Sequence, residues 1–209
     1  MKYPEIRIKY GWLLHEEVSV HLHKLYAKNG QQIADKEWMK LKVADYQNAW
    51  NPYENKIIKG MCDTLELEFR QNIIDVYIAP WFSAISDPMV IGVIFEPDLF
   101  IDKLTHELLH RLLTDNTAIP RKTKLLPVWQ KLFGSQHSIA ATVHIPVYAI
   151  HKLIYLDILN EPERLKRNIT NCKTNNLTEF VKAWDYVDKH DYKEIVEKLK
   201  ANYAELKIK

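Results

Sequence analysis

The chain has 209 residues, of which 47% are hydrophobic and 27% are charged, a balance that is ordinary for a globular protein. This length fits one domain, and with only 5 Gly and 9 Pro little of the chain is expected to be linker or low-complexity sequence. The formal net charge of +2 excludes the large basic excess that nucleic-acid-binding proteins usually carry.

The N-terminal third of the chain predicts one strand followed by helices. Its first residues alternate roughly between polar and apolar side chains, as a strand with one buried face does. The pair Asn29-Gly30 is typical of a helix end, and Pro52 is expected to interrupt a run of large apolar residues at helical spacing. We therefore expect a strand over residues 3–10 and helices over residues 13–28, 33–50 and 53–65.

The middle of the chain is richer in β-branched residues. The run at residues 72–79 predicts a strand, and residues 89–95 are apolar throughout, which suits a strand that is covered on both faces. Pro97 and Asp98 then favour a helix start, and apolar residues recur on one face of a helix over residues 99–113. The sequence therefore predicts a small sheet next to an amphipathic helix.

The C-terminal half is expected to be largely helical. Residues 116–136 look like a connection, whereas residues 139–159 form a long apolar segment that Pro146 either kinks or begins. Asp191 with Glu194 has the spacing of a capping box that opens a last helix.

The sequence His-Glu-Leu-Leu-His occupies residues 106–110, inside the amphipathic helix. Residues four apart on a helix lie one above the other, so His106 and His110 can both reach a zinc ion at about 2.0–2.1 Å. Glu107 is offset by about 100° from His106, so its carboxylate can reach a water in the open metal position. These roles are those of two metal ligands and a general base.

The motif and the apolar strand before it resemble the strand–helix unit of the zincin metallopeptidases, over residues 89–113. The metzincin subgroup is excluded, because it requires glycine at position 113 and histidine at position 116, where this chain has Leu113 and Asn116. Asn160 and Glu161 match a fragment of the downstream motif of the gluzincins. The resemblance therefore implies a gluzincin-like protein with His106 and His110 as metal ligands and Glu107 as the base.

A third protein ligand is needed if the fourth zinc position is to hold water. Candidates fall on one stripe of the second apolar segment, where His144, Tyr148, His151 and Tyr155 are spaced at i, i+4, i+7 and i+11. His144 and His151 are about two turns apart, too far to bind one ion together easily. We favour His144 as the ligand, with His151 or Tyr148 donating to the oxyanion. The reverse assignment and a Glu161 ligand, by analogy with the gluzincins, stay open.

These features favour an α+β fold in which a small sheet packs on the metal-binding helix and further helices precede and follow it. We expect a single domain over residues 1–209, with residues 173–209 as a helical extension that acts as a scaffold. In zincins an edge strand commonly pairs with an extended peptide, so the resemblance implies that residues 73–79 or 89–95 form that edge. The predicted function is zinc-dependent hydrolysis of peptide bonds in a narrow set of peptide or protein substrates.

Two other functions are consistent with the same motif. One is a regulatory protein, of a kind associated with phages, that keeps the zincin unit and cleaves a single cognate partner or none. The other is a helical interaction protein whose motif holds a structural metal or no metal.

The remaining features favour a cytoplasmic protein with no nucleic-acid or membrane partner. The N-terminus is charged and lacks the apolar stretch of a signal peptide, and no stretch is expected to act as a membrane span. Cys62 and Cys172 are expected to be buried or idle thiols. His15, His21 and His23 could form a small metal site on the first helix, although a polar helix face is favoured. The sequence sets no oligomeric state.

Overall fold

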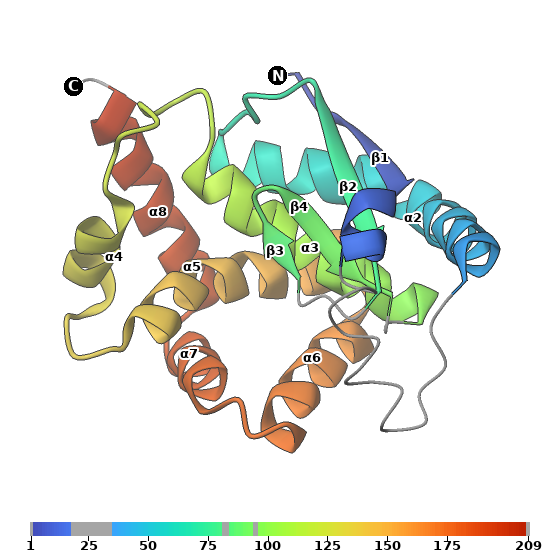
Figure 1. Ribbon diagram of the computed structural model, residues 1–209. Helices are drawn as coiled ribbons and strands as arrows, with labels where there is room; N and C mark the ends of the chain where they lie inside the picture. Colours follow the sequence, from blue (N-terminus) through green and yellow to red (C-terminus); the bar gives the residue numbers. More distant parts are fainter. Residues whose placement is uncertain (1, 18–34, 81–83, 94–95, 208–209) are drawn as a thin grey trace. The chain divides into compact units, whose positions relative to one another are not determined.

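The computed structural model describes residues 2–17, 35–80, 84–93 and 96–207. The described part combines a four-stranded sheet with helices, which confirms the α+β class (Figure 1). Its strands are β1 (Glu5–Tyr10), β2 (Ile73–Ala79), β3 (Ile85–Ser86) and β4 (Met89–Gly92). Its helices are α2 (Lys36–Leu65), α3 (Pro97–Thr114), α4 (Leu125–Phe133), α5 (Ile139–Leu153), the π-helix η2 (Ile154–Ile158), α6 (Pro162–Thr174), α7 (Thr178–Lys189) and α8 (Tyr192–Lys207).

The contacts within the chain form two compact units. We call the first the helical unit; it comprises Met1–Tyr3, Asn55–Arg70 and Leu109–Lys209. The second, which we call the sheet unit, comprises Pro4–Glu54 and Gln71–Leu108. Helices α2 and α3 each contribute residues to both units, and the C-terminal extension expected over residues 173–209 belongs to the helical unit.

In the sheet unit the strand order is β1-β2-β4-β3. Strands β1, β2 and β4 are parallel, and β3 pairs antiparallel with β4. The expectation that residues 73–79 or 89–95 form an edge of the sheet is wrong, because β2 lies between β1 and β4, and β4 lies between β2 and β3. The short strand β3, which the sequence did not signal, takes the edge position beside β4.

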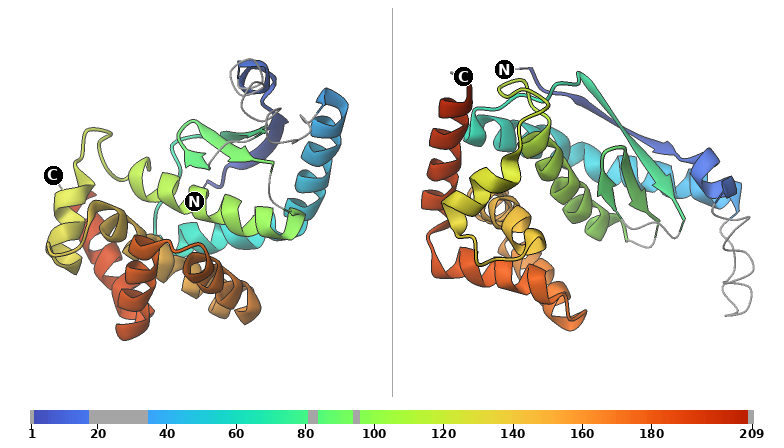
Figure 2. Two further views of the ribbon diagram at one scale, coloured as in Figure 1. Left: turned by 60° about the horizontal axis from the view of Figure 1, so that its bottom comes forward. Right: turned by 60° about the vertical axis from the view of Figure 1, so that its left-hand side comes forward.

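Side chains alternate across this sheet as its sequence pattern requires. On β1 and β2 the alternating buried positions are Ile6, Ile8, Ile74, Val76 and Ile78, and the positions between them are more exposed, while Ala79 at the end of β2 is also buried. Helices α2 and α3 lie on one side of the sheet in both views of Figure 2. Strand β4 is buried at all four positions, as its uninterrupted apolar sequence predicts.

The outer edge of β1 is occupied by side chains of α2. The backbone N–H groups of Ile6 and Ile8 point away from β2 and donate to Glu54 Oε1 and Gln47 Oε1, each at 3.1 Å. The Gln47 amide is in turn oriented by donating to Asn51 Oδ1 at 2.8 Å. These two outward N–H groups of the edge therefore already have acceptors.

Helix α2 is 30 residues long and continues through Pro52, so the expected break between two helices is wrong. Proline removes one hydrogen bond, to the carbonyl of Asn48. Both residues are exposed, so water can take the place of the lost donor. Beyond that turn, Ile57, Ile58 and Met61 are buried, and their packing extends the helix past the weak point.

The connection expected over residues 116–136 contains helix α4. Its Pro127 is the third residue of the helix, where a backbone N–H would lack an intrahelical acceptor anyway. Likewise, Pro146 lies inside α5 and neither begins nor ends it. The α5 backbone then runs on into the π-helix η2.

Helix α5 forms the centre of the helical unit, where it contacts α4, α7, α8 and η2. Residues 139–158 are long and apolar enough to cross a membrane by length and composition, but 67% of the stretch is buried inside the protein. Such burial is that of a core helix. The buried Cys62 and Cys172 are both free thiols, as predicted.

Candidate metal centre

Three histidines come together in the described part of the chain. The imidazoles of His106, His110 and His144 each offer a nitrogen, and these nitrogens all lie within 4.8 Å of one another. His106 and His144 are buried, and His110 is half-buried. The two histidines of the motif and the favoured third histidine therefore form one cluster, which His151 and Glu161 do not join.

The spacing within this cluster fits a metal ion. His110 Nε2 and His144 Nε2 are 3.3 Å apart. Two nitrogens bound tetrahedrally at about 2.0–2.1 Å would be separated by about 3.3–3.4 Å. Three neutral imidazoles suit zinc, and they also suit copper, nickel and iron, so the donor set fits a transition metal without selecting one.

Helix α3 supplies His106 and His110 because its apolar stripe fixes its rotation. Ile101, Leu104 and Leu108 are at most 2% exposed, which buries one face of the helix and determines where the histidines point. The helix ends at Thr114, and Asn116, two residues further on, donates from Nδ2 to the carbonyl of Leu112 at 2.9 Å. The residue at the position of the metzincin histidine is therefore a helix cap.

Helix α5 holds His144 in one tautomer. Ser138 caps the helix by accepting from the backbone N–H of Ala141 at 3.1 Å, so the helix begins one and a half turns before the ligand. His144 Nδ1 lies 2.7 Å from the carbonyl oxygen of Ala140, to which it can only donate. This bond leaves the lone pair on Nε2, the atom that faces His110.

Glu107, the expected base, is 5% exposed. Its Oε1 lies 3.2 Å from Lys103 Nζ, one turn earlier on α3, and the Lys103 side chain is 31% exposed. Burial raises the pKa of Glu107, and the nearby ammonium of Lys103 opposes that rise. Sequence reasoning missed Lys103, although its position four residues before Glu107 on the same helix could have identified it.

The two residues expected to stabilise an oxyanion lie in the aromatic core of the helical unit. Tyr148 is 1% exposed, its ring stacks on Trp184 at 4.1 Å, and its hydroxyl contacts Cys172 Sγ at 3.7 Å. His151 is fully buried, with its ring 4.9 Å from that of Tyr155. These surroundings are those of packed side chains, so the geometry does not favour an oxyanion role for either residue, which stays a prediction.

Glu161 and His15, two other candidate ligands, form contacts outside the histidine cluster. Glu161 pairs with the buried Arg164 on α6. His15 shares a hydrogen bond with the hydroxyl of Tyr10, whereas His21 and His23 lie outside the described residues.

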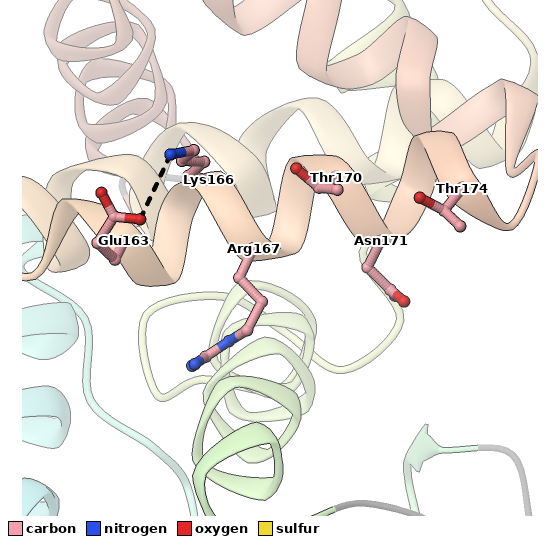
Figure 3. A pocket seen from close by; sticks show the side chains of 6 residues that line it. All are labelled: Glu163, Lys166, Arg167, Thr170, Asn171 and Thr174. Atoms are coloured by element: carbon pink, nitrogen blue, oxygen red, sulfur yellow. Dashed lines mark ion pairs between the residues drawn. The ribbon is translucent and has the colours of Figure 1, made fainter.

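An open pocket of about 400 Å³ runs along α6 (Figure 3). The six side chains that line it all come from this helix, and two of them, Glu163 and Lys166, are paired at 3.6 Å. The lining contains no histidine or cysteine, so it offers no donor set comparable to that of the histidine cluster.

The cluster of His106, His110 and His144 is thus the best candidate site in the described chain. Comparison of the sequence and structure with protein-family models, with curated proteins and with solved structures finds no match.

Proposed function

We propose that this protein is a zinc-dependent metallopeptidase that hydrolyses peptide bonds in a narrow set of peptide or protein substrates. The observation that carries the proposal is the convergence of three imidazoles, two of them from an HExxH helix in which the buried Glu107 directly follows His106. Three protein ligands leave one tetrahedral position for water or substrate, which distinguishes a catalytic from a structural zinc site.

A zinc ion held by His106, His110 and His144 would supply a Lewis acid that polarises a carbonyl and acidifies water. Glu107 takes the proton from the attacking water and returns it to the leaving amine. Lys103 fixes the orientation of the Glu107 carboxylate.

The sheet limits where an extended substrate can bind. The N–H groups of Ile6 and Ile8 on the outer edge of β1 already donate to Glu54 and Gln47, which favours the outer edge of β3 for strand addition in the described sheet. Strand β3 belongs to the same unit as Glu107. At two residues β3 offers few backbone groups, which supports a narrow range of substrates held by further contacts.

A second function is favoured by one specific observation. Tyr148 and His151 are both at most 1% exposed, so the side chains expected to stabilise an oxyanion are not displayed to a substrate. A regulatory protein that keeps the zincin-like metal site without hydrolysing peptides needs no such donor. Under this alternative, biological activity would survive replacement of the base.

The test begins with the metal. Protein purified without a polyhistidine tag should contain about one zinc per chain, and His106→Ala should lose it. Absence of stoichiometric metal from the wild type, or undiminished zinc in His106→Ala, contradicts the proposal.

The second step separates the two functions. The zinc-loaded protein is incubated with a diverse peptide library and with proteins that co-purify with it, and cleavage is read by mass spectrometry. Glu107→Gln should retain zinc but lower the cleavage rate by about 100- to 10,000-fold. Retained zinc with no cleavage of any substrate, and a biological activity that Glu107→Gln leaves intact, would favour the regulatory function.

A further inference from the structure

Helices α5 and α7 pack side by side in a constant register. Their contacts join residues 36 apart in sequence, in the pairs His144 with Phe180, Tyr148 with Trp184, and Lys152 with Asp188. The pair nearest the beginning of both helices contains the candidate metal ligand. Helix α7 therefore reaches the metal site at Phe180.

The imidazole of His144 is enclosed on its sides by aromatic rings. The Phe180 ring centroid lies 4.3 Å from that of His144 at an interplanar angle of 48°, and the Tyr148 ring lies 5.5 Å away at 47°. The bond from His144 Nδ1 to Ala140 alone would leave the ring some freedom of rotation, because the terminal torsion of histidine has broad energy wells. A ring packed against the imidazole restricts that rotation.

Phe180 differs from the other aromatic residues of this contact. Tyr148 and Trp184 are at most 1% exposed and belong to the core of the unit, whereas Phe180 is only half-buried. Its neighbour Glu179 accepts a hydrogen bond from Ser138, the capping residue of α5, which ties the two helix beginnings together. Phe180 thus lies where it touches the ligand while filling little of the core.

We infer that Phe180 is a positioning residue of the metal centre, which holds the His144 imidazole in the orientation that binds metal. Helix α7, part of the C-terminal extension that was expected to act only as a scaffold, thereby acts on the affinity for the ion. The inference rests on the proposed metal site, and it is independent of whether that site hydrolyses peptides. Loss of a hydrogen-bonding partner of a metal-bound histidine lowers metal affinity by about 10- to 100-fold, and we expect loss of this packing contact on the same ring to act within that range.

The experiment compares zinc and cobalt affinities of full-length variants. Phe180→Ala should weaken binding by about 10- to 100-fold and alter the ligand-field absorption of the cobalt form, whereas Phe180→Tyr should restore both. Tyr186→Ala is the matched control. Tyr186 is an aromatic residue on the same helix, and its ring contacts His137 and His190, which lie outside the cluster. The Tyr186→Ala variant should bind metal as tightly as the wild type.

A double-mutant cycle separates positioning from general destabilisation. In a His144→Ala background, Phe180→Ala should have no further effect on metal affinity, because the residue it positions is gone. A Phe180→Ala protein that binds metal as tightly as the wild type would overturn the inference. So would a loss of affinity that persists unchanged in the His144→Ala background.

A measurement without metal distinguishes failure of the site from failure of this inference. In NMR spectra, the chemical shifts of the two imidazole nitrogens of His144 report its tautomer. Phe180→Ala should move these chemical shifts toward those of a mixture of two tautomers, while Tyr186→Ala leaves them unchanged. If the wild type binds no metal but this shift occurs, the proposed function falls and the positioning stands. If the shift is absent and metal affinity is unchanged, the positioning falls.

Discussion

Helices α3 and α5 both carry polar side chains at helical spacing within apolar sequence, yet they use that spacing differently. On α3 the two histidines four residues apart both join the metal cluster. On α5 the stripe begins with His144 and continues through Tyr148 and His151, but only His144 joins the cluster and the others pack in the core. Spacing on one helix identifies a pair of ligands, whereas the partner they meet depends on how other helices pack.

The difference between His144, which joins the cluster, and His151, which does not, should have its largest effect on metal affinity. His144→Ala should weaken zinc binding by about 1,000-fold, equivalent to about 4 kcal/mol, because one of three ligands is lost. His151→Ala should leave zinc affinity unchanged although it opens the core. The measurement is competition with a chromophoric chelator, at a temperature where both variants are folded. Equal losses in the two variants would show that both histidines bind metal.

The second effect concerns the stability of the α5 stripe. Tyr148→Ala removes a buried ring that stacks on Trp184, and should lower the free energy of unfolding by about 3 kcal/mol in denaturant titrations. Tyr148→Phe keeps the ring and should cost less than about 1 kcal/mol, because the contact with Cys172 Sγ is long at 3.7 Å. If Tyr148→Phe instead slows peptide cleavage by about 100-fold without losing stability, the hydroxyl acts on the substrate.

The third effect concerns the support of α3. Helix α2 stacks Tyr46 on Phe100 of α3 at 4.2 Å, and burial raises the pKa of Tyr46 and of Cys62, also on α2, each to about 12. The unfolded chain releases these protons at lower pH than the folded chain does. The stability they contribute is therefore complete below about pH 9 and is lost as the pH rises toward 12.

We expect the free energy of unfolding to fall by about 1–2 kcal/mol per group between pH 9 and 11. Denaturant titrations across this range measure the loss. Tyr46→Phe and Cys62→Ala should each flatten the dependence, and a dependence that neither variant changes would show that these groups do not cause it.

The smallest effect lies where η2, the continuation of α5, approaches α2. A Cβ on Gly60 would lie 2.5 Å from Ile158 Cδ1, the end of a side chain that can move. Alanine also favours the helix by about 1 kcal/mol over glycine, so Gly60→Ala should cost only about 1 kcal/mol overall. Shortening the opposing side chain with Ile158→Val should remove that cost in the double variant. An additive double variant would mean that the contact is unimportant.

The sequence predicts those features that depend on neighbouring residues. The β-branched run of β2, the apolar strand β4 and the stripe of α3 each bury what their spacing implies. Asp191 is likewise a helix cap, accepting from the N–H of Lys193 at 2.9 Å. Local geometry is sufficient in these cases, because each pattern has one favourable way to bury its apolar side.

The features that the sequence did not predict depend on distant residues. The continuation of α2 past Pro52 depends on packing beyond the proline, and the interior positions of β2 and β4 depend on strands formed elsewhere in the chain. The pairing of His144 with Phe180 likewise joins two helices whose register no local pattern reveals. For the same reason, the choice between His144 and His151 needed the packing of the helical unit.

The side chains that occupy the outer edge of β1 have a consequence for how copies of the protein behave at high concentration. A parallel strand with an open edge is a template on which another chain can build, and edge-to-edge growth of this kind leads to aggregates. Glu54 and Gln47 accept from the Ile6 and Ile8 N–H groups that such growth would use, and Glu54 adds a negative charge at the same place. The β1 edge is therefore a poorer template for a second chain than an open strand edge would be.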